Sequence, residues 1–252
     1  MLLVAWAAGL SLVACASREQ PVQLRFALRD ADAVQRLQLY VHDVALVGDD
    51  GAAHPLTLVP RAPWQSQRVA LLDFAAAQTQ RDVIEGSAPS RRYTGVRFVV
   101  GVPFDLNHGN QLTAAAPLDR ADMFWSWQSG YKFLRLDLAA GEHEAAFHLG
   151  STGCSSASAL RPPQQPCAQP NLIHVELTGF DPLTQPIQVR IEEIVAALAE
   201  GETHACTGDY SQTACARAFA MTGLDAISGQ CLASEGDAGR VCAGQRLFAV
   251  GE

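Results

Sequence analysis

The sequence predicts a mainly β protein, an antiparallel β-sandwich of the immunoglobulin-like kind with a short, disulfide-stapled helical tail at its C-terminus. Apolar and polar residues alternate at period two in several short segments. Turn-forming residues separate these segments, and helical periodicity is confined to one stretch. Because a sheet with one apolar face needs a second layer over that face, we expect two packed sheets.

The expected strands follow from this alternation. The first covers 22–28, and a second runs from 37 to 47, enters a Gly-Asp-Asp-Gly turn at 48–51 and returns through 56–59 as a β-hairpin. Residues 96–100 also alternate at period two. Further strands are expected at 69–72, 131–138, 145–149, 172–177 and 187–191.

The chain divides into a signal region at 1–15, a β-sandwich domain at 20–200 and a cysteine-rich extension at 201–252. The stretch Ile191–Ala199 has helical periodicity, so we expect a short helix where the sandwich ends. The extension is rich in Gly, Ala and Cys, which predicts helical turns held by disulfides.

The N-terminal segment has the form of a secretory signal. Residues 1–15 are apolar, end in small side chains and are too short to span a bilayer. The sequence Leu12-Val-Ala-Cys15 matches a bacterial lipobox, so we expect acylation of Cys15, and Ser17 favours sorting to the outer membrane. The expected location is the periplasm, with attachment to the membrane only through the lipid.

The remaining six cysteines form three couples that are close in sequence. Close spacing favours sequential disulfides, each contributing about 2–3 kcal/mol when unstrained. A zinc site or a thiolate copper site is the alternative, but no couple has the C-x2-C spacing of structural zinc ligands. The expected pairs are Cys154 with Cys167, Cys206 with Cys215, and Cys231 with Cys242.

Composition excludes several classes of function. The net charge of −8 argues against binding to nucleic acid. Only three methionines occur, which excludes a methionine-rich surface for passing copper along. No Gly-x-Ser-x-Gly motif marks a hydrolase, and we expect the protein not to be an enzyme.

The segment Met123-Phe-Trp-Ser-Trp-Gln-Ser-Gly-Tyr-Lys-Phe133 holds two of the four tryptophans. Residues two apart in an extended segment share one face, so we expect the rings of Trp125 and Trp127 to lie side by side. Such a pair serves either core packing or chemistry. Together with an exposed Tyr131 it would form a stacking platform for carbohydrate or another envelope protein, which is the alternative function.

Several short motifs follow one another along the chain. They are Leu39-Tyr-Val-His-Asp-Val44, Tyr93-Thr-Gly-Val-Arg-Phe98, Gly101-Val-Pro-Phe-Asp-Leu-Asn-His108, the tryptophan segment, Phe147-His-Leu-Gly-Ser-Thr-Gly-Cys154 and Gly223-Leu-Asp225. Over residues 22–248 the chain resembles the MbnP-like family, also described as metallo-mystery pair system four-Cys motif proteins. The resemblance implies a periplasmic copper-binding protein whose partner is a di-haem, MauG-like enzyme related to cytochrome c peroxidase.

The resemblance also implies roles for individual residues. One tryptophan, Trp125 or Trp127, would be oxidised by the partner to kynurenine and help to ligate copper, as Cu(I) or Cu(II). The implied role is sequestration or delivery of copper. The four cysteines of the family name would correspond to Cys154, Cys167, Cys206 and Cys215.

Three histidines are candidate copper ligands, because imidazole suits copper. His148 lies in a family motif, and alternation places it on the polar face of its strand. His42 lies likewise opposite an apolar face, beside Asp43, and His108 lies at the mouth of a loop. Asp43 or Asn107 would orient an imidazole. The spacing leaves the ligand set open among His148, His42 and His108.

Overall fold

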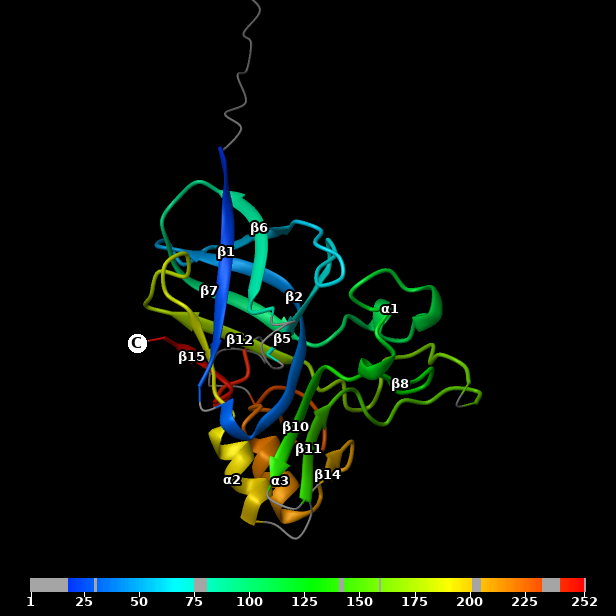
Figure 1. The fold of residues 1–252 in the computed structure, drawn as a ribbon. Helices are drawn as coiled ribbons and strands as arrows, with labels where there is room; N and C mark the ends of the chain where they lie inside the picture. The colour runs from blue at the N-terminus through cyan, green and yellow to red at the C-terminus, as the bar shows by residue number, and fades with distance from the viewer. Residues whose placement is uncertain are drawn as a thin grey trace, which may run out of the picture.

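The computed structural model describes residues 18–29, 31–74, 81–140, 143–158, 160–200, 205–232 and 241–251. The predicted signal region and its acylation site, Cys15, lie outside these ranges. Within them, two main sheets form the body of the molecule, helices α2 and α3 lie at one end, and a side lobe carrying α1 and β8 projects from one flank (Figure 1). The predicted β-sandwich is confirmed.

The first sheet has the strand order β15-β13-β1-β6-β4. Its strands are β1 (Glu19–Leu28), β4 (Thr57–Leu58), β6 (Val83–Pro89), β13 (Ile187–Val189) and β15 (Phe248–Val250). Strand β1 pairs antiparallel with β6 and parallel with β13. The alternation pattern does not predict β6, because Gly86 and Pro89 interrupt it.

The second sheet follows the order β12-β7-β2-β10-β11-β14, with β3 and β5 also paired to β2. Its strands are β2 (Val34–Gly48), β3 (Ala53–Pro55), β5 (Val69–Asp73), β7 (Tyr93–Val100), β10 (Leu134–Ala140), β11 (His143–Leu149), β12 (Ile173–Thr178) and β14 (Ala205–Thr207). The predicted hairpin closes with β3. The predicted return strand at 56–59 is wrong, because Thr57 and Leu58 pair with β6 of the first sheet.

The helices are α1 (Phe104–Asn107), α2 (Glu192–Glu200) and α3 (Thr213–Ala220), with short 3-10 turns η1 (Ala31–Ala33), η2 (Gln111–Thr113) and η3 (Ala121–Met123). Helix α2 matches the predicted helix at 191–199, and its buried residues Ile194 and Leu198 lie one turn apart on the core side. Among the described residues, no helix is both long and apolar enough to cross a membrane.

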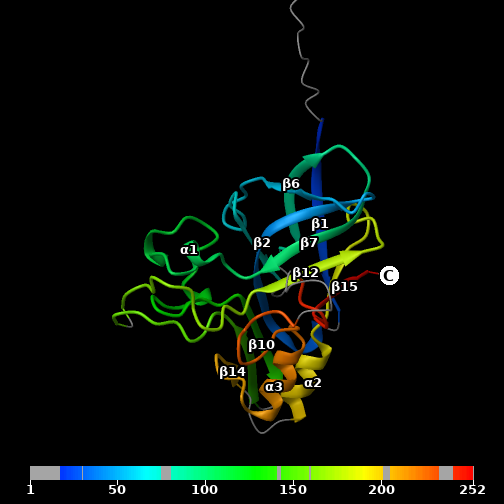
Figure 2. The same ribbon diagram turned by 180° about the vertical axis from the view of Figure 1, so that it is seen from behind.

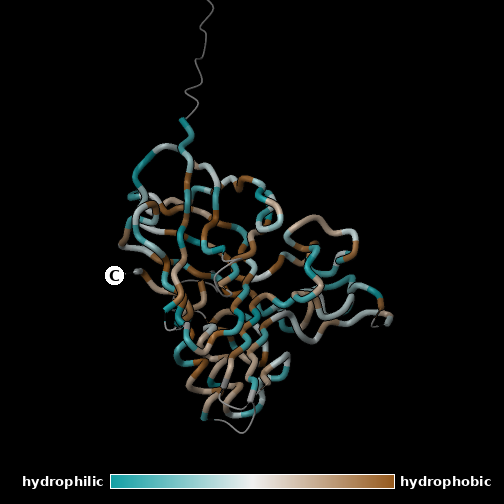
Figure 3. Tube along the Cα trace, viewed as in Figure 1, coloured by the Kyte–Doolittle hydropathy of each residue, from teal (hydrophilic) through white to brown (hydrophobic). Residues whose placement is uncertain are grey.

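Aromatic side chains join the two sheets. Phe98 on β7 packs edge-on against Phe26 on β1, with ring centroids 5.7 Å apart, and against Phe248 on β15, at 5.1 Å. All three side chains are buried in one continuous core. Apolar stretches run through the packed strands and helices (Figure 3). These ring contacts hold the two sheets against each other, and so they fix the position of the strands whose outer faces are polar.

The C-terminal extension forms part of the sandwich. Strand β14 pairs with β11, and β15 pairs with β13. Phe219 of α3 and Phe248 of β15 belong to the main core. Helix α3 is the helical part expected in this region, and it packs beside α2, at the end of the molecule where β10 and β14 lie (Figure 2).

The predicted sequential disulfides are confirmed. Cys154 is bonded to Cys167, Cys206 to Cys215, and Cys231 to Cys242. Since the sulfurs of each couple are bonded to each other, these couples do not hold zinc or copper as thiolates in this state.

Candidate metal centre

The side lobe covers part of the outer face of the second sheet. The chain leaves β7 at Gly101, runs through α1, η2, η3 and the ribbon of β8 (Phe124–Ser126) and β9 (Gly130–Tyr131), and re-enters the sheet as β10. A second buried cluster lies beneath the lobe and includes Tyr40, Val102 and Tyr131. The lobe is therefore held by its own apolar contacts, apart from the core between the sheets.

Ser151 lies at the junction between the lobe and the end of β11. Asn107, the last residue of α1, donates from Nδ2 to Oγ of Ser151 at 2.9 Å. The Asn107 Oδ1 atom accepts from the backbone N–H of Tyr131 at 2.8 Å. Cys154 Sγ lies 3.7 Å from the same serine oxygen. This junction brings α1, the tryptophan ribbon and the first disulfide together.

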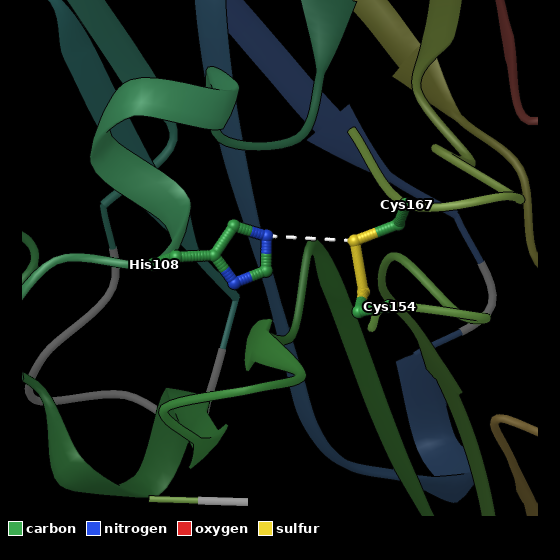
Figure 4. A group of neighbouring side chains, drawn as sticks. All are labelled: His108, Cys154 and Cys167. Atoms are coloured by element: carbon green, nitrogen blue, oxygen red, sulfur yellow. Dashed lines mark hydrogen bonds between the residues drawn. A yellow bond between two sulfur atoms is a disulfide. The ribbon is translucent and has the colours of Figure 1, made fainter. Parts of the chain in front are cut away.

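His108 follows α1 and is buried at this junction. Its Nε2 lies 3.2 Å from Asn107 Nδ2 and 3.5 Å from Cys167 Sγ (Figure 4). Burial lowers the pKa of His108, and a hydrogen bond with the backbone of Trp127 offsets this only in part. Nδ1 is fully buried. A neutral imidazole is suited to bind a metal ion through its unprotonated nitrogen.

His148 lies on the polar face of β11, as alternation predicts, between the buried Phe147 and Leu149. Its Nε2 lies 2.7 Å from Oδ1 of Asp137 on β10. Burial favours the neutral carboxyl of Asp137, but hydrogen bonds from His148 and Arg135 outweigh this and lower its pKa to about 2. The charged carboxylate holds the ring in place through Nε2, as carboxylates beside metal-bound histidines do. Nδ1 is then the nitrogen that can bind an ion.

His42 occupies a different part of the sheet. It lies on β2 between Val69 of β5 and Val99 of β7. Both ring nitrogens are buried and lack a hydrogen-bond partner within the described ranges, although Asp43 Oδ2 approaches Nδ1 to 3.1 Å. Burial lowers the pKa of His42, the nearby carboxylate of Asp43 raises it, and the charges of His174 and Arg68 lower it by less.

The three predicted histidines do not form one cluster. In the part of the chain that the structure describes, one group of three potential ligands has all its donor atoms within 4.8 Å of one another, namely His108, Cys154 and Cys167. In the disulfide-bonded state only His108 of this group is a strong donor. His148 does not belong to this group, so a metal site that includes His148 needs ligands from elsewhere.

Trp125, on β8 of the side lobe, lies against the end of β11. Its ring covers Gly150, where an added Cβ atom would lie 2.5 Å from Cζ3 of the indole. Gly150 directly follows β11, whose last residues include His148, so the indole covers the end of the strand that carries this imidazole. Trp125, Ser151 and Cys154 also line a cavity of about 500 Å³.

The prediction that both indoles share one face is wrong. Strand β8 ends at Ser126, and Trp127 begins the turn that leads into β9. The ring of Trp127 packs edge-on against Phe124, with centroids 6.5 Å apart. Tyr131 is fully buried, and its hydroxyl donates to the backbone oxygen of Leu118. The expected platform of three exposed rings is therefore not formed.

Asp137 and Ser151 were not expected as parts of the site. Asp137 lies two residues after Arg135, which pairs with His148 in the register of β10 and β11. A register between strands is not visible in the sequence, so the local signal for Asp137 was only its position on the polar face of a predicted strand. Of the two residues expected to orient an imidazole, Asn107 contacts His108 and Asp43 lies beside His42.

The geometry can be compared with known proteins. A family model described as MbnP matches residues 16–209. The chain belongs to the MbnP family. Membership makes it a periplasmic, copper-related protein. The solved structure of MbnP from Methylosinus trichosporium is similar, with a TM-score of 0.75 and 27% sequence identity, and the match covers 93% of this chain and 99% of that one. No curated protein matches the chain.

An acidic residue anchors the tryptophan strand. Asp122 lies in η3, just before β8, and its carboxylate is 3.0 Å from Arg36, 3.0 Å from Arg120 and 3.4 Å from Arg135. Burial would raise the pKa of Asp122, but the hydrogen bond from Arg120 and the three positive charges lower it. Arg36 and Arg135 belong to β2 and β10, so the carboxylate ties β8 to the sheet.

Replacing Asp122 with Asn should lower the free energy of unfolding by about 2 kcal/mol at pH 7, because three guanidinium groups lose a charged acceptor. A carboxyl whose pKa is lower in the folded state stabilises above its unfolded pKa of about 3.9 and loses that effect as pH falls. Urea unfolding at pH 7 and pH 3 should therefore show a smaller difference from the original protein at pH 3. The matched variant Asp49→Asn, in an exposed ion pair, should cost less than about 1 kcal/mol. A pH-independent difference would contradict this.

Replacing Gly150 with Ala tests the position of Trp125. The new methyl group would overlap the indole and the Tyr131 carbonyl, so Trp125 must move outward at a cost of about 1–3 kcal/mol. Tryptophan fluorescence should shift to longer wavelength, and stability should fall. Gly109→Ala is the control, because its Cβ would make ordinary contact at 3.4 Å. Equal spectra and stabilities for both variants would show that Trp125 does not cover Gly150.

Proposed function

We propose that this protein binds copper, as Cu(I) or Cu(II), in the region between the side lobe and the end of β11. The observation that carries the proposal is the place of Trp125, which lies over Gly150, two residues after His148, and lines the same cavity as Ser151. The proposed ligands are His148, His108 and a donor made from Trp125. We do not include His42, because it lies on β2 between Val69 and Val99 and belongs to no group of close donor atoms among the described residues.

The chemistry of these residues supports a copper ion. Imidazole nitrogens suit copper, and burial keeps His108 neutral so that no proton has to leave before an ion binds. Opening the indole of Trp125 to kynurenine would supply a carbonyl oxygen and an amine nitrogen at the same place. Copper bound there would be held in a fixed donor set, which suits sequestration or delivery.

The proposed oxidant is a di-haem, MauG-like partner. In this proposal the protein is the substrate of that partner and is not itself an enzyme. The structure supports Trp125 over Trp127 as the residue that reaches the site when oxidised, because Trp127 packs on Phe124 in the turn. The proposed location is the periplasmic face of the outer membrane, with a lipid on Cys15.

Histidine variants test the ligand set. His148→Ala and His108→Ala should each weaken copper binding at least about tenfold, because each removes a donor, whereas His42→Ala should leave the affinity unchanged. The measurement is competition with a chromophoric copper chelator, using protein isolated together with its modified residue. His54→Ala is the control, since His54 lies on β3 opposite Leu46 of β2 and contacts Arg91. Unchanged affinity in both test variants would exclude this ligand set.

A further inference from the structure

The Cys154–Cys167 disulfide lies against an imidazole in a way that the other two do not. His108 Nε2 is 3.5 Å from Cys167 Sγ, and the three donor atoms lie within 4.8 Å of one another (Figure 4). No other described cysteine belongs to such a group. Two thiols at these positions would complete, with His108, a set of two sulfurs and one nitrogen.

The two residues of this bridge differ in their exposure. Cys154 is half-buried, and Cys167 is buried at 7% exposure. In the Cys206–Cys215 bridge both residues are almost fully buried, whereas Cys231 of the third bridge is half-buried, as Cys154 is. Thiol–disulfide exchange needs direct access of the attacking thiolate to one sulfur. Cys154 offers that access, and Cys167 is the leaving sulfur beside the imidazole.

The surroundings suit a soft cation. A cavity of about 170 Å³ adjoins the bridge and His108. Apolar side chains form most of its wall, including Phe104, Phe133 and Leu172. Two thiolates with one imidazole beside this apolar wall are soft donors that favour Cu(I) over hard cations. The cavity also leaves room for the two sulfurs to separate once their bond is broken.

We propose that Cys154–Cys167 is a reducible gate over a second copper site, formed by both thiolates and His108 once a dithiol reductant has opened the bridge. The choice of copper rests on the proposed function. The geometry itself assigns a soft-metal site that exists only in the reduced state. In the reduced state His108 serves the second site, and the first ion keeps His148 and the donor made from Trp125, so both sites are filled.

The exchange balances without another reactant. A thiolate of the dithiol attacks Sγ of Cys154, the S–S bond breaks, and the electron pair leaves on Cys167 Sγ, which takes up a proton. The second thiol of the reductant then displaces Cys154 Sγ as a thiol. The reductant ends as a disulfide and the protein as two thiols, and binding of Cu(I) releases the two thiol protons.

The test compares Cu(I) binding by the oxidised protein and by protein treated anaerobically with dithiothreitol and then desalted. Thiols are counted with a chromogenic disulfide. Cu(I) is added as its bicinchoninate complex, and the sulfur-to-copper absorption in the ultraviolet is recorded. The reduced protein should show two new thiols and one copper equivalent more than the oxidised protein. The copper bound by the oxidised protein tests the proposed function separately, so one proposal can be contradicted without the other.

Matched variants show which residues bind the additional copper. Cys154→Ser with Cys167→Ser should abolish the gain in copper. Cys231→Ser with Cys242→Ser should keep it, because no described imidazole nitrogen lies within 4.8 Å of both sulfurs of that bridge, which contacts the backbone N–H of His174. His108→Gln retains the bridge and should give the same thiol count but an affinity at least about tenfold weaker. The proposal is overturned if the native protein yields no thiols, if reduction adds no copper, or if the gain survives in the Cys154 and Cys167 double variant.

Discussion

The arrangement of the candidate site depends on the buried side chain of Asn107. It donates to Ser151 at the end of β11 and accepts from the N–H of Tyr131 in the tryptophan ribbon. Gly130 makes this possible, because its φ is +77° and an added Cβ would lie 2.4 Å from Asn107 Oδ1. A buried amide left unpaired costs about 1–3 kcal/mol, so these contacts hold three segments in one geometry.

The hydrogen bonds of Asn107 also position the candidate ligands. His108 is the next residue after Asn107, so fixing the amide also fixes the imidazole against the disulfide. Trp125 lies on the ribbon whose turn ends at Gly130, and its ring lies over Gly150, directly after the strand that carries His148. Asp137 holds His148 by a charged hydrogen bond. These contacts hold each of the three side chains in place.

Features that repeat along the chain were predictable from the sequence. Period two placed His148 on the polar face of its strand, and close spacing identified the disulfide couples. Features that depend on partners from elsewhere in the chain were not. The contact of Asp137 with His148 depends on strand register, and Trp127 leaves the extended segment because of the hydrogen bonds around Gly130. The pairing of β14 and β15 with remote strands likewise leaves no local pattern.

The central claim is that Trp125 is the oxidised residue at a copper centre. The most direct test is peptide mass spectrometry across residues 123–133, with copper analysis, on protein purified from its native envelope with the di-haem partner present. Kynurenine at Trp125 together with stoichiometric copper is the result that this account predicts. Copper-loaded protein with an intact indole at Trp125, or with kynurenine only at Trp127, would contradict it.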